Sequence, residues 1–346
     1  MLNRIAVVTM NFAVRQAPRK SLLATAANSR AITLSNMKTP SVFRLTLAGL
    51  STSLMFLSAR AAEPKQIELW PEGVPGLRAD ATPEKIDQTH ASNVHHPYLV
   101  AFPAPTDQSV GTAVIICPGG SYKSLSIENE GSLIARHLNT LGVTAFVLHY
   151  RMVEYGHPAP LRDVLRAIRL LRSRAAELGV KPDRIGVLGA SAGGHLAASA
   201  ATLFDDPDGK TGGKLDAVSG RPDFAVLLYP VITMKDPFTH ALSRKDLLGP
   251  VLTPEAIEHL SLELHVTKDT PPTLIMHTED DRTVPVENSL MFYQALRTAG
   301  VPAELHIWPK GPHGFGMKPN LGGPSTWPQR CDEWMRANGW LTAPPP

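Results

Sequence analysis

The stretch from Ile185 to Gly193, which reads IGVLGASAG, decides how this chain is expected to fold. It begins as an apolar run of strand length, and beyond Gly193 an alanine-rich segment favours a helix. Between the two lies a G-x-S-x-G, whose glycines leave room for a tight strand-to-helix turn. Ser191, at its centre, would stand above a sheet at a helix N-terminus, where backbone amides favour developing negative charge. The stretch therefore predicts a nucleophilic serine at a strand–turn–helix junction.

Apolar runs and helix-like patterns alternate along the chain on both sides of this stretch. The expected buried strands are Ala113–Cys117, Thr144–Leu148, Ile185–Leu188, Phe224–Tyr229, Thr273–His277 and Ala303–Trp308. The expected helices are Ser132–Leu141, Pro160–Leu178, Gly193–Leu203, Asn288–Ala299 and Thr326–Asn338. Because alternating strands and helices require right-handed crossovers, this order predicts an α/β protein with a mostly parallel central sheet flanked by helices.

Edge strands, an insertion and a charged helix face complete the expected architecture. Short apolar pieces at 67–70 and 98–101 indicate antiparallel edge strands. Residues 231–270 carry short helical pieces punctuated by prolines, and we expect them to form a small lid between two strands. The helix at 160–178 carries a run of arginines that we interpret as a solvated face: Arg162, Arg166, Arg169 and Arg172.

The first 62 residues are expected to be a targeting segment. They contain eight Lys and Arg but no Asp or Glu, so the rest of the chain has a net charge of −5 although the whole has +3. From Met37, a basic stretch, an apolar run and Ala59-Arg60-Ala61 follow in the order of a secretory signal peptide, with an organelle transit peptide as the alternative. We therefore expect a signal segment over 1–61 with its true start at Met37, a single domain over 62–346, and a secreted or periplasmic protein.

A serine hydroxyl needs a base that is held in place by a third group, and candidates for both follow in the sequence. His313 lies in the glycine-rich loop after strand Ala303–Trp308, and Asp280 and Asp281 lie in the loop after strand Thr273–His277. Serine, acid and histidine in this order, each on a loop after a strand, are typical of the α/β-hydrolase fold. The two adjacent carboxylates both remain candidates for the acid.

The loop that carries these carboxylates resembles the H-G-x-x-D-x-x-V-P signature of hydrolases. The matching residues are His277, Asp281, Val284 and Pro285. This resemblance implies that Asp281 orients His313, and that Asp280 caps the loop or is solvated.

Donors for the oxyanion of a tetrahedral intermediate are expected in the loop after strand Ala113–Cys117. Residues 118–122, which read PGGSY, resemble the His-Gly-Gly-Gly-aromatic loop of esterases, with a serine in place of the third glycine. The residues implied are Gly120, Ser121 and Ala192 for the oxyanion hole, and Gly119 and Tyr122 for substrate binding.

Four segments together resemble the bacterial acetyl-xylan-esterase-like branch of this fold, whose relatives are acetyl and feruloyl esterases of plant polysaccharides. The segments are 69–76 (LWPEGVPG), 118–122 (PGGSY), 183–189 (DRIGVLG) and 284–289 (VPVENS). The resemblance covers roughly Ile67 to Leu341 and implies deacylation of sugar esters, whereas the residues alone indicate only acyl transfer. No dinucleotide fingerprint, P-loop or metal-ligand spacing such as H-E-x-x-H occurs, so we expect neither a cofactor nor a metal.

The leading interpretation is a serine carboxylesterase acting on short acyl esters of plant polysaccharides or oligosaccharides, with no nucleic acid or membrane as partner of the mature form. One alternative is a general short-chain carboxylesterase without sugar preference. A second is a serine exopeptidase of the prolyl-oligopeptidase type, although about 50 residues between signal and oxyanion strand are too few for a propeller. A binding module without catalysis is a third, but such a module is expected to lack a member of the triad.

Overall fold

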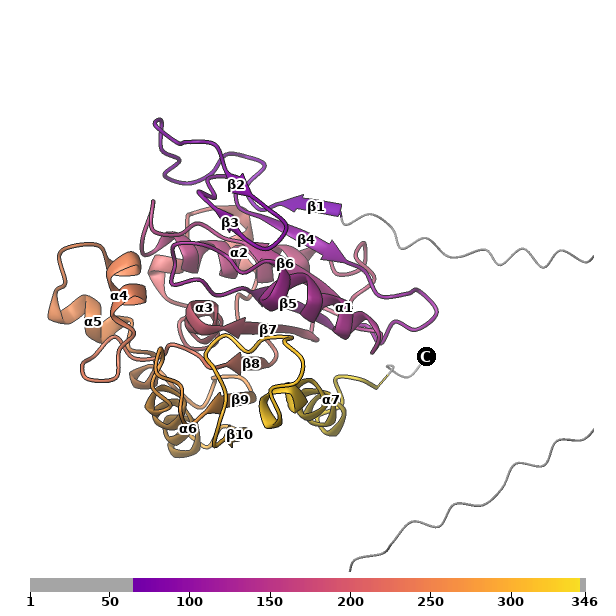
Figure 1. Cartoon of the computed structure of the whole chain (residues 1–346). Coiled ribbons are helices and arrows are strands. Elements are labelled where there is room, and N and C mark those ends of the chain that lie inside the picture. The colour runs from indigo at the N-terminus through magenta and orange to yellow at the C-terminus, as the bar shows by residue number, and fades with distance from the viewer. Residues whose placement is uncertain (1–64, 343–346) are drawn as a thin grey trace, which may run out of the picture. The chain divides into compact units, whose positions relative to one another are not determined.

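An eight-stranded sheet runs through the part of the chain that the computed structural model describes, residues 65–342 (Figure 1). In spatial order its strands are β1 (Lys65–Glu68), β4 (Tyr98–Phe102), β6 (Thr144–His149), β5 (Ala113–Cys117), β7 (Ile185–Ala190), β8 (Ala225–Leu228), β9 (Thr273–Thr278) and β10 (Ala303–Trp308). β4 runs antiparallel to β1 and β6, and the pairings from β6 to β10 are parallel. A small separate sheet pairs β2 (Lys85–Ile86) with β3 (Ala91–Ser92). The predicted α/β class is confirmed, with the antiparallel pair β1–β4 at one edge.

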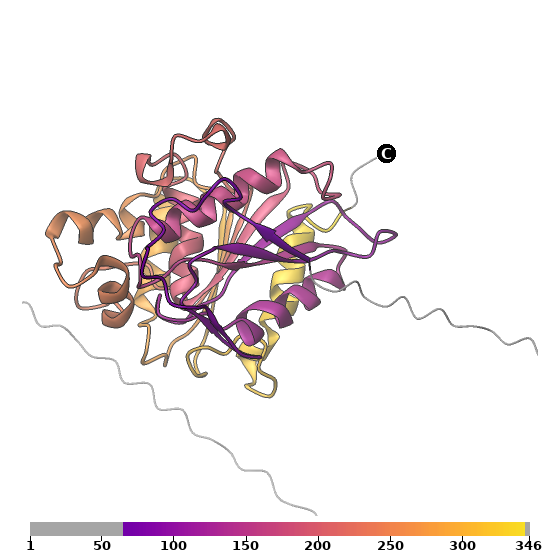
Figure 2. The same cartoon turned by 90° about the horizontal axis from the view of Figure 1, so that it is seen from above.

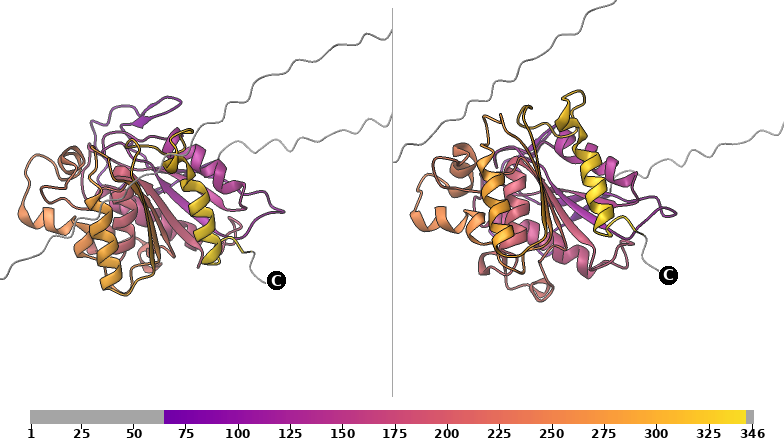
Figure 3. Two further views of the ribbon diagram at one scale, coloured as in Figure 1. Left: turned by 60° about the horizontal axis from the view of Figure 1, so that its bottom comes forward. Right: turned by 90° about the horizontal axis from the view of Figure 1, so that it is seen from below.

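Helices cover both faces of this sheet (Figures 2 and 3). They are α1 (Leu133–Asn139), α2 (Ala159–Ser173), α3 (Ser191–Thr202), α6 (Glu287–Thr298) and α7 (Trp327–Ala337). Successive side chains of a strand point to opposite faces, so β5 contributes to two cores. Val114 and Ile116 pack with α1 and α7, whereas Ile115 and Cys117 pack with α2, α3 and α6. This burial on both faces explains why the inner strands are continuous apolar runs.

The arginines of α2 do not form the solvated face that the sequence predicts. Arg166 is 6% exposed and Arg169 is 2% exposed. Arg166 donates to the carbonyl oxygen of Leu69 at 2.8 Å and lies over the ring of Trp70, and Arg169 donates to the carbonyl oxygen of Gly209 at 2.8 Å. The prediction was wrong for these two residues because carbonyl groups of distant loops satisfy the guanidinium donors, which allows them to be buried.

The insertion at 231–270 lies between β8 and β9 and forms α4 (Ala241–Leu248), α5 (Pro254–His259) and a 3-10 turn, η4 (Leu262–Leu264) (Figure 1). Hydrogen bonds attach it to the rest of the fold. The side chain of Asn288, on α6, accepts from the backbone N–H of Ile232 at 2.8 Å, and the carbonyl of Leu247 accepts from the N–H of His157 at 2.8 Å. That this insertion acts as a lid stays a prediction.

The predicted signal segment over 1–61, with its start at Met37, lies outside the described residues. The same holds for the first three residues of the predicted domain over 62–346 and for its last four. Among the residues that are described, no helix combines the length and the hydrophobicity needed to cross a bilayer.

Candidate active site

Ser191 lies where β7 meets α3, at the turn that the G-x-S-x-G predicts. Its φ of +54° is in the left-handed region that residues with a side chain rarely adopt. The glycines make room for this turn, because a Cβ on Gly189 would collide with the carbonyl of Gly193, and a Cβ on Gly193 would collide with the carbonyl of Cys117. The strained turn places the serine side chain, 5% exposed, at the N-terminal end of α3.

The three residues predicted as a triad are brought together by the sheet. Because β7, β9 and β10 are parallel, the loops at their carboxyl ends share one edge of the sheet. Nε2 of His313 lies 2.9 Å from Oγ of Ser191, and Nδ1 of His313 lies 2.6 Å from Oδ2 of Asp281. Imidazole can thus take the serine proton at one nitrogen while the carboxylate holds the N–H at the other.

The two adjacent aspartates have different surroundings. Asp281 is 7% exposed, and its Oδ1 accepts from the N–H groups of Thr283 and Val284 at 2.8 and 3.0 Å. Burial opposes its charged form, but hydrogen bonds from His277 and His313 outweigh burial and hold the pKa of the carboxyl well below its usual range. This side chain therefore stays ionised beside His313.

Asp280 points to the histidine loop instead of the histidine ring. Its Oδ1 accepts from the N–H of Gly311 at 2.8 Å, and its Oδ2 lies 3.4 Å from Nζ of Lys310. The Gly311 hydrogen bond, and after it Lys310, lowers the pKa of this carboxyl. Asp280 thus caps the loop that leads to His313.

The predicted oxyanion loop lies directly against the serine. A Cβ on Gly119 would lie 2.9 Å from Cβ of Ser191, so the glycine is needed for the close approach. The N–H groups of Gly120 and Ser121 have no acceptor among the described residues. The N–H of Ala192 is in the first turn of α3, where a helix leaves its N–H groups unpaired. These three donors are available to an oxyanion, whereas the Gly119 N–H is already bound by Glu130 at 2.8 Å.

The side chain of Tyr122 does not line the site that the sequence predicts for it. It is 1% exposed, and its hydroxyl lies 2.8 Å from Nδ1 of His195. Nε2 of His195 lies 2.9 Å from the carbonyl oxygen of Leu260, which can only accept, so Nδ1 accepts from the tyrosine. Burial lowers the pKa of His195 to about 4, so the ring is neutral at neutral pH. Tyr122 supports the oxyanion loop from the core and links it through α3 to the insertion.

Glu130, on a π-helical turn before α1 (η1, Glu128–Ser132), is a site residue that the sequence analysis missed. One carboxylate oxygen accepts from the N–H of Gly119, and the other accepts from the hydroxyl of Tyr229 at 2.9 Å. That hydroxyl accepts from the N–H of Gly316, in the histidine loop, at 3.0 Å, and the Tyr229 ring packs edge-on against His313 with centroids 5.0 Å apart. Burial raises the pKa of the Glu130 carboxyl. This carboxyl group therefore connects the oxyanion loop to the loop of the base.

We expect Glu130→Ala to lower kcat about ten- to hundredfold with little change in KM. Leaving a buried donor unsatisfied costs about 1–3 kcal/mol, and about 1.4 kcal/mol corresponds to tenfold in rate. Glu130→Gln, which retains an acceptor for the Gly119 N–H, should recover much of this loss. Steady-state kinetics on an activated acetyl ester measures both, with Glu177→Ala, an exposed glutamate that pairs with Arg174, as the control. Equal losses in Glu130→Ala and Glu177→Ala would contradict the connecting role.

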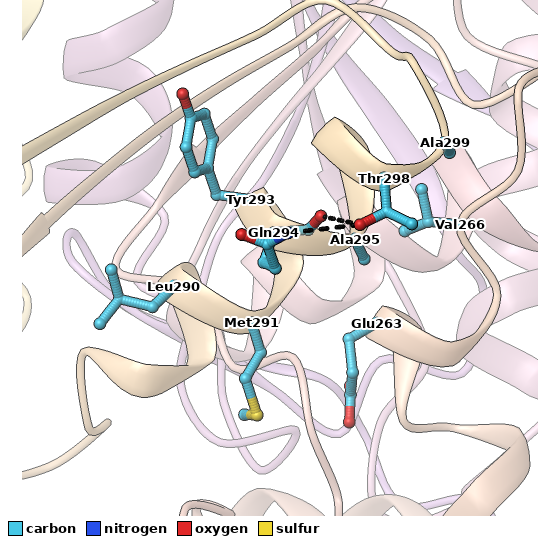
Figure 4. A pocket seen from close by; sticks show the side chains of 9 residues that line it. All are labelled: Glu263, Val266, Leu290, Met291, Tyr293, Gln294, Ala295, Thr298 and Ala299. Atoms are coloured by element: carbon cyan, nitrogen blue, oxygen red, sulfur yellow. Dashed lines mark hydrogen bonds between the residues drawn. The ribbon is translucent and has the colours of Figure 1, made fainter.

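Two hollows of the surface differ in their relation to the triad. One, of about 790 Å³, is lined by α6 and by residues 263–266, and no triad residue lines it (Figure 4). The other, of about 320 Å³, has Glu130 and Gly314 on its wall and thus adjoins the histidine loop. Its remaining wall includes the polar residues Thr89, Ser126, Asn129 and Lys318. Of these two hollows, the second is the one that adjoins the loop of His313, although no triad residue lines it either.

A mostly parallel sheet with a nucleophile turn after one strand and an acid and a histidine after later strands defines an α/β-hydrolase. The model of the BD-FAE family matches residues 100–296, more than half of the chain. The chain belongs to this family.

Relatives and solved structures agree with this assignment. The chain is 40% identical over 206 residues to endo-1,4-beta-xylanase B of Butyrivibrio fibrisolvens, covering 58% of this chain and 32% of that protein. It is 34% identical over 240 residues to the acetylxylan esterase of Xylanibacter ruminicola, covering 68% and 46%. The chain thus spans less than half the length of these two relatives. Among solved structures, the chain is similar to an acetyl ester-xyloside bifunctional hydrolase from Caldicellulosiruptor lactoaceticus, with 40% sequence identity and a TM-score of 0.73. The comparison covers 82% of this chain and 99% of that one.

Proposed function

We propose that this protein is a serine carboxylesterase that hydrolyses short acyl esters, acetyl esters above all, carried by plant polysaccharides or oligosaccharides. The observation that carries the proposal is the line from Ser191 through His313 to Asp281, with hydrogen-bond distances of 2.9 and 2.6 Å. Such a line, next to unpaired N–H groups, is the arrangement that acyl transfer requires.

The reaction proceeds in two halves on these residues. Oγ of Ser191 attacks the ester carbonyl carbon while its proton passes to Nε2 of His313, and the oxyanion that forms accepts from the N–H groups of the Gly120 loop and of Ala192. His313 then gives the proton to the leaving alcohol, and an acyl-enzyme remains. A water molecule, deprotonated by His313, attacks the acyl carbon, and the carboxylic acid leaves as Ser191 recovers its proton. Asp281 keeps the same imidazole tautomer throughout.

Two observations favour acetylated sugars as substrates. One relative is named an acetylxylan esterase, and one similar solved structure is named an acetyl ester-xyloside bifunctional hydrolase. The hollow beside His313 is walled by polar side chains that can exchange hydrogen bonds with the hydroxyl groups of a sugar. Through Gly314 this hollow adjoins the loop that carries His313.

We expect kcat/KM to be highest for acetyl to butyryl esters and to fall for longer acyl chains. Each CH₂ gains roughly 0.8 kcal/mol only where it is buried among apolar groups, and the hollow with a mostly apolar wall, along α6, includes no triad residue. A series of nitrophenyl esters from acetyl to dodecanoyl measures this trend. Release of acetate from acetylated xylan, with the deacetylated polymer as the control, tests the sugar part.

Aminoacyl anilides belong in the same assay. Their hydrolysis at a higher kcat/KM than that of acetyl esters would support an exopeptidase instead. A rise toward octanoyl esters together with no acetate from xylan would refute both the preference for short chains and the preference for sugars.

We also propose that the protein acts outside the cytoplasm, in the periplasm or after secretion. The proposal rests on the acid-free composition of residues 1–62 and on the small residues before Ala62. Mass spectrometry of the protein isolated from its host should find the mature N-terminus at Ala62 or within a few residues of it. An intact segment 1–36 would contradict the proposal.

A further inference from the structure

Two histidines and two aspartates gather where the insertion meets the α/β body. His157 lies in the loop between β6 and α2. Asp208 lies in the turn η2 (Pro207–Gly209), which follows α3, and Asp206 is the N-cap of that turn. His259 is the last residue of α5, in the insertion. The cluster therefore joins three segments that are far apart in the sequence and contains no residue of the proposed catalytic machinery.

The distances within this cluster are only partly those of hydrogen bonds. Nε2 of His157 lies 3.0 Å from Oδ2 of Asp208, an ordinary hydrogen-bond distance. Nε2 of His259, however, lies 3.6 Å from Oδ2 of Asp206 and 3.9 Å from Oδ2 of Asp208, both too long for a hydrogen bond. This nitrogen is buried and has no hydrogen-bond partner among the described residues. The cluster thus contains a buried imidazole nitrogen that faces two carboxylates without bonding to either.

The same distances fit the ligand shell of a metal ion. Zinc binds imidazole nitrogen and carboxylate oxygen tetrahedrally at about 2.0–2.1 Å, which places neighbouring ligand atoms about 3.3 Å apart. The measured separations of 3.0, 3.6 and 3.9 Å lie around this value. The ligand atoms of His157, Asp208 and His259 all lie within 4.8 Å of one another. A tetrahedral ion between them would need only small movements of the side chains.

The α/β body holds both aspartates in place for such a role. Oδ1 of Asp206 accepts from the N–H of Asp208 at 2.8 Å, which leaves its Oδ2 facing His259. The carbonyl oxygen of Asp208 accepts from Nε of Arg162, on α2, at 2.9 Å. Hydrogen bonds that fix the ligand side chains or their backbone are characteristic of metal sites.

We propose that His157, Asp208 and His259 form a binding site for a divalent transition-metal ion of the zinc class, which fastens the insertion to the α/β body. Two imidazoles and a carboxylate suit zinc, and are too rich in nitrogen for magnesium or calcium. The fourth position of a tetrahedral shell is open to Asp206, whose Oδ2 lies 3.6 Å from Nε2 of His259, or to a water molecule. Sequence spacing did not predict this site because the ligands come from three separate segments.

A chain of hydrogen bonds connects the proposed metal site to the oxyanion loop, so the ion itself takes no part in the chemistry. His259 is followed by Leu260, whose carbonyl oxygen accepts from His195, and His195 in turn accepts from Tyr122 of the loop. Metal binding at His259 therefore steadies the backbone on which this chain of hydrogen bonds rests.

The test uses the whole protein, first stripped of metal with a chelator. Titration calorimetry should find one Zn²⁺ bound per chain and no binding of Mg²⁺. Zinc at roughly 100 times its dissociation constant should raise Tm by about 5 °C. His157→Ala and His259→Ala should lose this binding and the shift in Tm, and Asp208→Asn should bind more weakly. His137→Ala is the matched control, because His137 pairs with Asp332 at 2.9 Å on another part of the fold, and it should bind zinc as the unmodified chain does.

The result that would overturn the proposal is a chain that binds no zinc, or His259→Ala and His157→Ala variants that bind it as tightly as the unmodified chain. The second outcome would place the ion elsewhere, for example at His313. Circular dichroism of each metal-free variant establishes that it is folded. Because the readouts are stoichiometry and Tm, the test stands whether or not the protein proves to be an esterase.

Discussion

Ser191→Ala is expected to lower kcat on acetyl esters by roughly 10⁵- to 10⁶-fold while the protein stays folded. The hydroxyl supplies the attacking atom, and its one side-chain hydrogen bond among the described residues is to His313. Removing the hydroxyl therefore abolishes the nucleophilic attack but changes the packing of the core little. Kinetics with nitrophenyl acetate, together with thermal unfolding of both proteins, measures the two effects separately.

Ser199→Ala is the matched control for this variant. Ser199 is also buried and also on α3, but it lies about two turns beyond Ser191, and its hydroxyl donates to the carbonyl oxygen of His195. It should retain activity within a few-fold. If Ser191→Ala kept near-native turnover, the proposed nucleophile would be wrong, whatever the behaviour of Ser199→Ala.

Asp281→Asn is expected to lower kcat by roughly 10⁴-fold, because an amide in that place favours the wrong tautomer of His313. Asp280→Asn should lower it less than about tenfold, since an asparagine oxygen can still accept from the N–H of Gly311. Each variant controls for the other, because the two residues are adjacent and the two substitutions are identical. The rates of both variants on one acetyl ester at one pH show which substitution lowers kcat more. A larger loss in Asp280→Asn would make Asp280 the acid.

The positions of Ser191 and His313 could be predicted because they depend on local patterns and on one rule of topology. The G-x-S-x-G between strand and helix indicates the turn, and loops after parallel strands meet at one edge of the sheet. β7 is buried on both faces and its apolar run predicts it, whereas β10, at the edge of the sheet, is only partly buried and is predicted from its place in the alternation of strands and helices. Most of the strands and helices are predicted from their own residues. An error in the bounds of one element therefore leaves the predicted positions of the others unchanged.

The choice between Asp280 and Asp281 could not be made from the residues themselves. Two adjacent carboxylates have the same chemistry, and what separates them is direction: one side chain meets His313 and the other meets Gly311. Only the resemblance to a signature favoured Asp281. The structure supplies the physical reason that the sequence lacks.

Glu130 and Tyr122 show what local patterns miss. A glutamate on a short turn is most often solvated, and nothing near it in the sequence indicates the N–H of Gly119 or the hydroxyl of Tyr229. An aromatic residue after a glycine-rich loop suggests contact with substrate, but the ring of Tyr122 meets His195 in the core instead. Tyr122 and Glu130 have partners 73 and 99 residues away, and the buried arginines Arg166 and Arg169 have partners 97 and 40 residues away.

The order of the strands has a consequence for how the proposed active site is assembled during folding. Ser191 and His313 are separated by 122 positions, and the loop of His313 follows β10, an edge strand that pairs with β9. Contacts of such long range form only after the intervening chain has closed, and they slow folding. A nascent chain that has completed β5 to β8 therefore holds a nucleophile and an oxyanion loop but no base. The proposed active site is complete only when β10 has joined the sheet. Esterase activity would therefore show that the whole sheet has formed.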